Sequence, residues 1–190
     1  MGLGISFAVG SNSGCGAAQL HNDAIADPYA HFATNIPALN TSGCNNTYPQ
    51  ETHQGNHYTV ATSNQLSGTM TLTAGNHFLC GDQLLTGNVT VNAPATGAVL
   101  IIENGQLDLN GNTFQTSSGS GLTVVFSGTN GSYTHAPTDN TNGSGGALNI
   151  AAPNSGNWSG VAVYQDPSLT SGVDVSAAGN SPTWDITGLI

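Results

Sequence analysis

The feature of this sequence that most constrains its fold is a short unit that recurs in the second part of the chain. Each unit opens with a glycine that precedes alternating polar and apolar residues, and the five units begin at Gly68, Gly87, Gly111, Gly146 and Gly172. Successive units start 19 to 35 residues apart. Repeats of this length are typical of solenoids, and the alternation favours β-strands over helices.

The first four units continue into a second apolar run, which predicts a second column of strands. These runs are His77–Cys80, Val99–Ile102, Thr123–Phe126 and Val161–Tyr164, and Thr183–Ile186 takes the same place in the fifth unit. We therefore expect an all-β fold, a right-handed parallel β-helix (solenoid) in which each rung buries its apolar face against its neighbours. A β-sandwich or jelly roll would contain similar short strands and is the alternative.

The repeats divide the chain into two parts. Residues 1–57 form a loop-rich N-terminal segment that we expect to pack on the solenoid, with one short helix within Leu20–Phe32 that starts near Asp27 and Pro28. Residues 58–190 form the solenoid domain. Residues 128–145, rich in Gly, Asn, Ser and Thr, are predicted to be a loop inserted at one corner.

The charge pattern excludes several functions. The chain has no Lys or Arg and ten acidic residues, so its formal net charge is −10. Nucleic-acid binding is not expected, because neutralisation of phosphates requires Lys or Arg. The longest apolar runs fall far short of the ~20 residues that cross a bilayer, so no membrane span is expected. Lyases that cleave acidic polysaccharides generally need a basic residue, which this chain does not contain.

Five acidic residues of the repeat region are candidates for a functional role: Asp82, Glu103, Asp108, Asp166 and Asp174. Asp82, Glu103 and Asp166 each follow a second strand, so we expect them near one corner, on rungs ~4.8 Å apart. Three interpretations remain open. The carboxylates are solvated, or they hold Ca²⁺, which prefers carboxylate and carbonyl oxygens, or two of them catalyse glycoside hydrolysis. The solvated state is the simplest, and no cofactor other than calcium is expected.

Three aromatic residues, Trp158, Tyr164 and Trp184, are candidate contacts for a glycan. Packing in the core or at a sheet edge is the alternative role for the same side chains. The sequence also contains three cysteines, and we predict a disulfide between Cys44 and Cys80. Cys15 is then left over, unless it pairs with one of these two.

Several segments resemble a known family. Asp27-Pro28-Tyr29 with Cys44 downstream, the segment Leu72–Gly81 and, most specifically, the segment Ala152–Pro167 are similar to the central region of bacterial tight-adherence (Flp) pilus-assembly proteins of the TadG type. The last segment resembles the family pattern AP-x-SG-x-(aromatic)-x-G-(apolar)-x-(apolar)-YQD. The resemblance implies an exported, β-rich region of a cell-surface appendage and carries over no catalytic residue.

These observations predict a non-enzymatic, extracellular structural or adhesive module of a surface appendage. We expect its partners to be further copies of this chain or other appendage subunits, because the ends of a β-helix offer unpaired backbone groups. Self-assembly into a fibre would follow from this. The alternative is a β-helix that binds or hydrolyses polysaccharide.

Overall fold

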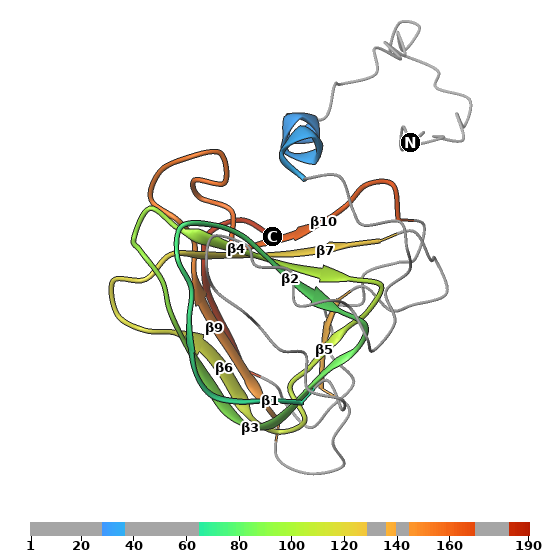
Figure 1. The fold of residues 1–190 in the computed structure, drawn as a ribbon, viewed down its shortest axis with the longest axis vertical. Coiled ribbons are helices and arrows are strands. Elements are labelled where there is room, and N and C mark those ends of the chain that lie inside the picture. The colour runs from blue at the N-terminus through green and yellow to red at the C-terminus, as the bar shows by residue number, and fades with distance from the viewer. Residues whose placement is uncertain (1–27, 37–64, 129–135, 140–144, 170–182) are drawn as a thin grey trace, which may run out of the picture.

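The structure is a computed structural model that describes residues 28–36, 65–128, 136–139, 145–169 and 183–190. The described part is rich in strands and has one short 3₁₀-helix (Figure 1), which agrees with the predicted all-β character. The elements are η1 (Ala30–Asn35), β1 (Gln65–Thr71), β2 (Gly75–Cys80), β3 (Gln83–Asn92), β4 (Ala98–Glu103), β5 (Leu107–Asp108), β6 (Thr113–Thr116), β7 (Leu122–Ser127), β8 (Pro137–Thr138), β9 (Ala147–Ala151), β10 (Val163–Gln165) and β11 (Thr183–Thr187).

The strands form two parallel sheets. One is a four-stranded sheet in the order β10-β7-β4-β2, and the other is a seven-stranded sheet with the path β11-β9-β6-β3-β5-β8, in which β1 also pairs with β3. Every strand pair within the described residues is parallel. A jelly roll consists of antiparallel strands, so this pairing does not support that alternative.

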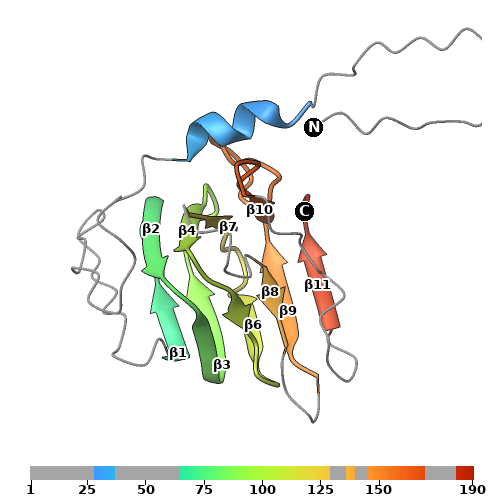
Figure 2. The same cartoon turned by 90° about the vertical axis from the view of Figure 1, so that its right-hand side faces the viewer.

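The strands lie in three columns, which we call faces, and each pass of the chain visits them in the same order. The first face contains β5 and β8, the second contains β6 and β9, and the third is the four-stranded sheet. The start of β3 pairs with β5, and β5 pairs with β8, whereas the end of β3 pairs with β6, which pairs with β9. After each such pass the chain enters the four-stranded sheet. Figure 2 shows the strands of successive passes lying side by side along the molecule.

The core lies between the two sheets. Every residue of β4 and of β7 is buried, because these strands have neighbours on both sides and apolar residues on both faces. The main core cluster includes Leu85, Leu100, Phe114, Leu122 and Leu148, each of which is fully enclosed. Since no Lys or Arg is present, apolar burial and hydrogen bonds are the interactions that stabilise this stack.

A column of left-handed residues forms one corner of the stack. Gly81, Asn104 and Gly128 follow β2, β4 and β7, and their φ angles are 75°, 53° and 142°. The backbone N–H of Gly81 donates to Glu103 and that of Asn104 donates to Ser127, so the parallel ladder continues through the turn. Glycine and asparagine tolerate this conformation best.

The repeat alignment on glycines places several strands in the wrong register. It pairs His77 with Val99 and Val89 with Thr113, whereas the structure pairs His77 with Leu100 and Val89 with Phe114. The inward side chains determine the register because a shift of one residue turns every side chain to the opposite face. The glycines lie at corners whose length varies from one pass to the next, so they do not mark equivalent positions.

Two further predictions about the repeat are wrong. Thr183–Ile186 does not join the column of second strands, because β11 pairs with β9 in the seven-stranded sheet. Residues 128–145 are not purely a loop, since β8 lies within them and pairs with β5. The fifth unit's first run at Gly172 lies outside the described residues. The division into a head and a solenoid also stays a prediction, because most of residues 1–57 lies outside them.

A 3₁₀-helix spans Ala30–Asn35, so it begins shortly after the predicted start at Pro28 but overlaps the predicted segment only at residues 30–32. Residues 20–27 lie outside the described part. The side chain of His31 hydrogen-bonds the carbonyl oxygen of Pro28 at 3.0 Å through Nδ1, and the Thr34 hydroxyl donates to the carbonyl oxygen of His31. Figure 2 shows η1 running across the outer side of the molecule, over the four-stranded sheet.

Candidate functional site

The candidate site lies where η1 and the segment after β9 cover the outer face of the four-stranded sheet. Strands buried on both faces carry apolar residues outward as well as inward, and here Val99, Ile101 and Val125 point outward. Phe32 of η1 and Trp158 pack on them and complete a second apolar cluster, separate from the main core. Helix η1 is thereby attached to the four-stranded sheet through aromatic contacts.

Three aromatic rings form the centre of this cluster. The ring of Phe32 stacks on Trp158 with centroids 5.5 Å apart and planes at 14°. Tyr164 meets Trp158 edge-on at 5.2 Å and Phe32 at 6.0 Å. Phe32 and Trp158 are buried, at 8% and 6% exposure. Such pairs stabilise by about 0.5–1.5 kcal/mol beyond the area they bury.

The segment Pro153–Gly160 is held against the sheet by close backbone contacts. Pro153 lies so near Gly97 and Gly121 that a β-carbon on either would come within 2.5 Å and 2.8 Å of it. The backbone N–H of Asn154 donates to the carbonyl oxygen of Ala95, 3.1 Å away. These contacts position Trp158. Pro153 and Asn154, which make them, lie in the segment Ala152–Pro167, which has the most specific family resemblance.

A polar groove opens on one side of Trp158. It has a volume of about 340 Å³, and its walls come from the end of η1, the corners before β2 and β4, and the segment around Ser155. The side-chain Nδ2 of Asn35 donates to the backbone oxygen of Asn157 at 3.1 Å, which joins η1 to that segment. Polar and apolar groups contribute about equally to the surface of its walls.

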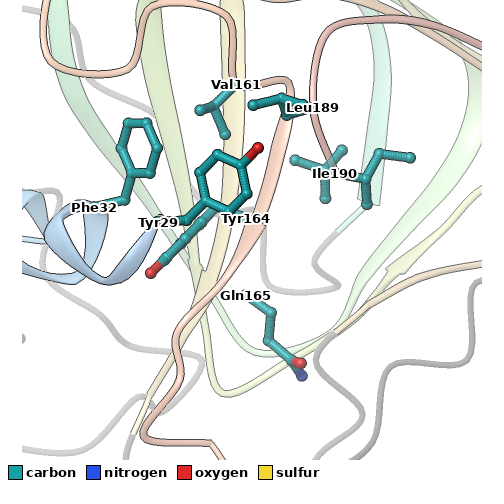
Figure 3. Close-up of a pocket in the computed structure, with 8 residues that line it drawn as sticks. Tyr29, Phe32, Val161, Tyr164, Gln165, Leu189 and Ile190 are labelled. Atoms are coloured by element: carbon teal, nitrogen blue, oxygen red, sulfur yellow. The ribbon is translucent and has the colours of Figure 1, made fainter. Parts of the chain in front are cut away.

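An apolar cavity of about 220 Å³ opens on the other side of the aromatic cluster (Figure 3). Tyr29, Phe32 and Tyr164 line it together with residues near the end of the sequence, Leu189 and Ile190. Figure 3 shows the rings of Tyr29, Phe32 and Tyr164 grouped on one side and Leu189 and Ile190 on the other. The aromatic cluster therefore separates a polar groove from an apolar cavity.

The three acidic residues predicted to share a corner have different surroundings. Asp166 accepts a hydrogen bond from the Ser127 hydroxyl at 2.6 Å and further bonds from Ser168. Glu103 pairs with Ser127 in the ladder and is buried, at 2% exposure. Asp82 is exposed and accepts from the backbone N–H of Gln106 at 3.0 Å, on the next pass of the chain.

A calcium site on these three carboxylates stays a prediction. Within the described ranges, no three His, Cys, Asp or Glu side chains gather closely enough to hold a metal ion. Asp82 and Asp166 instead accept hydrogen bonds from the protein's own groups. Asp108 follows this pattern, since it accepts from the N–H of Asn110. Asp174 lies outside the described residues.

The remaining predicted residues lie apart from this site or outside the described part. Trp184 lies on β11 and packs against the main core, so it does not join Trp158 and Tyr164. Cys80 is buried at the end of β2. Cys15 and Cys44 lie outside the described residues, so the Cys44–Cys80 disulfide stays a prediction.

Sequence reasoning missed two important residues. Asp139 is fully buried, and its carboxylate accepts hydrogen bonds from the backbone N–H groups of Gly111 and Gly146. Asp139 lies in the segment 128–145, which its composition predicts to be a loop, so the sequence gives no signal of its burial. Phe32 was assigned no role, although Tyr29 and Phe32, three residues apart, provided a weak signal of an aromatic face.

Comparisons with known proteins add no relative: no family model, curated protein or solved structure matches this chain. In the part of the chain that the structure describes, we find no helix with the length and apolar character needed to span a membrane.

Proposed function

We propose that this chain is a right-handed parallel β-helix that serves as a non-enzymatic, extracellular structural and adhesive module of a surface appendage, and that its copies stack end to end. The regular order in which the chain visits its three faces supports the β-helix, because such connections between parallel strands are almost always right-handed. The resemblance to pilus-assembly proteins supports the appendage, and the lack of basic residues favours a setting outside the cell.

The observation that carries the proposal is the pairing and exposure of the two end strands, β1 and β11. Within the described residues, β1 pairs only with β3 and β11 pairs only with β9. Five of the seven β1 residues and three of the five β11 residues are exposed, whereas β4 and β7 are entirely buried. An edge strand of this kind is a template for pairing with another chain.

The β11 end also carries apolar surface. A cavity of about 170 Å³ there is lined by Leu148, Val163, Trp184 and Ile186 among others. At the β1 end, Leu66 is only partly buried and packs against the same core. Addition of β1 of one copy to β11 of another would stack Leu66 near Trp184 and Ile186. A head-to-tail contact of this type does not close on itself, so it builds a filament.

The two end strands themselves carry little charge. Strand β1 contains no charged residue and β11 contains only Asp185. Natural sheets often protect their edges with Lys or with an inward-pointing charge, and Lys is absent from this chain. The non-enzymatic character is supported by Asp82, Asp108 and Asp166, whose carboxylates accept hydrogen bonds from groups of the protein itself.

Light scattering coupled to size exclusion tests the proposal. We expect the wild-type chain to form species well above its monomer mass of 19.1 kDa as concentration rises, and negative-stain imaging to show filaments. In the variant Leu66→Lys, stacking would bury a charge at the interface, so this variant should remain at the monomer mass.

The matched control is Thr69→Lys on the same strand. Thr69 is exposed on the outer face, so its substitution adds the same charge without placing it between stacked copies. This variant should assemble like the wild type. A wild-type chain that stays monomeric at every concentration, or equal loss of assembly in both variants, would refute end-to-end stacking.

A further inference from the structure

The polar groove beside Trp158 has the chemistry of a ligand site. It is the most polar of the sizeable hollows near the aromatic cluster, and its volume of about 340 Å³ lies within the range of small-molecule sites, roughly 300–1,000 Å³. The side chains of Asn35, Asn76, Ser155 and Asn157 line it. Each carries an amide or a hydroxyl, and these groups both donate and accept hydrogen bonds.

Glycines give a ligand access to the backbone in this groove. Gly75, Gly97 and Gly156 lie in its walls, and their φ angles are 112°, 102° and 82°. These left-handed conformations favour glycine. At Gly97 the free space is filled by Pro153, whereas at Gly156 the nearest atom to a β-carbon would be 3.8 Å away, so a ligand can approach the main chain there. Trp158 adds an apolar wall, and its ring is held in place by Phe32.

The charges of the groove and of the whole chain limit which class of ligand can bind. None of the described residues that line the groove is acidic or basic, so they offer no counter-charge to an ionic ligand. The chain as a whole carries a net charge of −10 without any Lys or Arg, which disfavours an anionic ligand further. A ligand that uses many neutral donors and acceptors together with an apolar face is a neutral sugar.

From these observations we infer that the groove between η1, the β2 and β4 corners and the Pro153–Gly160 segment binds a neutral saccharide. Asn76 and Asn157 provide hydrogen bonds to its hydroxyl groups, and the exposed Ala74 together with the accessible edge of the largely buried Trp158 provides the apolar contact. This inference rests on the adhesive part of the proposed function, because it names the class of molecule to which the module adheres. It does not depend on stacking of copies.

Affinity electrophoresis in native gels provides the test, since the acidic protein migrates readily. The gels contain dextran, laminarin, galactomannan or xyloglucan as neutral probes and polygalacturonate as the anionic probe. We expect at least one neutral polymer to retard the wild-type chain and polygalacturonate to have no effect. Asn76→Ala should raise the apparent dissociation constant at least tenfold.

Two variants separate loss of binding from loss of folding. Ala74→Tyr fills the groove from an exposed position and should abolish retardation. Asn92→Ala removes an exposed amide outside the groove, at the end of β3, and should bind like the wild type. The thermal melting of each variant confirms that it is folded.

Three results would overturn the inference: no retardation by any of the four neutral polymers, equal retardation of the wild type and Ala74→Tyr, or retardation by polygalacturonate alone. Light scattering on the same samples distinguishes this failure from that of the proposed assembly. If the chain forms filaments but binds no neutral polymer, the saccharide site is refuted and the proposed assembly stands.

Discussion

At the residue scale, the buried carboxylate of Asp139 shows how single polar groups connect the passes of this chain. Its two oxygens accept from the N–H groups of Gly111 and Gly146, which lie on successive passes. Asn110 and Asn112 play a related part, because both side chains donate to the carbonyl oxygen of Leu85 on the preceding pass. Such hydrogen bonds satisfy backbone groups at the corners, where the strand ladders are interrupted.

The substitution Asp139→Asn should destabilise the fold. Asparagine has one acceptor oxygen, so one buried N–H would face an amide donor, at a cost of about 1–3 kcal/mol. For a domain of this size the melting temperature should fall by roughly 3–10 °C, which calorimetry or circular dichroism measures. The control is Asp185→Asn on the exposed face of β11. Equal melting of both variants would show that Asp139 does not stabilise the corner.

At the scale of elements, η1 and the four-stranded sheet form a unit with its own apolar cluster. The outward side chains of β4 and β7 would be exposed without a cover, and Phe32 and Trp158 provide part of that cover. The contacts are aromatic and involve no ion pair between the residues named. The attachment of η1 therefore depends on shape and apolar area, since the chain contains no Lys or Arg.

Phe32→Ala should release η1 while the strand stack remains folded. Burial of a Phe of this kind is worth about 3–5 kcal/mol, and most of that loss should appear locally, in η1 and around Trp158. In a Trp184→Phe background Trp158 is the remaining indole, and its fluorescence emission should shift to longer wavelength.

The control for this prediction is Tyr29→Ala in the same background. Tyr29 is 47% exposed, so its loss should shift the emission far less. If the two variants shift equally, or if Phe32→Ala also unfolds the sheets, then η1 is not an independently released cover.

At the scale of the whole molecule, the net charge of −10 opposes the proposed stacking of copies. Each copy repels the next, and salt screens this repulsion because the Debye length is about 10 Å at 0.1 M and 3 Å at 1 M. Raising sodium chloride from 20 mM to 500 mM should therefore increase the mass of the assemblies measured by light scattering, at equal protein concentration. A decrease with salt would instead indicate that the contact between copies is electrostatic.

The strand content of this chain could be predicted from its sequence because alternation of polar and apolar residues is a local property. The apolar runs at Val99–Ile102 and Thr123–Phe126 lie in β4 and β7, and their predicted register relative to each other is confirmed. Trp158 and Tyr164 lie beside each other in the aromatic cluster, and their role as glycan contacts stays a prediction. Trp184 was grouped with them wrongly, because sequence spacing does not reveal which sheet a strand joins.

Local patterning thus determines that this chain forms short strands stabilised by apolar burial and hydrogen bonds, with no ion-pair network to assist them. Tertiary structure alone decides which strands are neighbours, as with β11 on β9, since pairing depends on inward side chains and on corner lengths that no local pattern encodes. It also brings Asn35 of η1 to Asn157 across 122 residues of sequence. Both residues line the candidate groove, so this long-range contact brings two parts of its wall together.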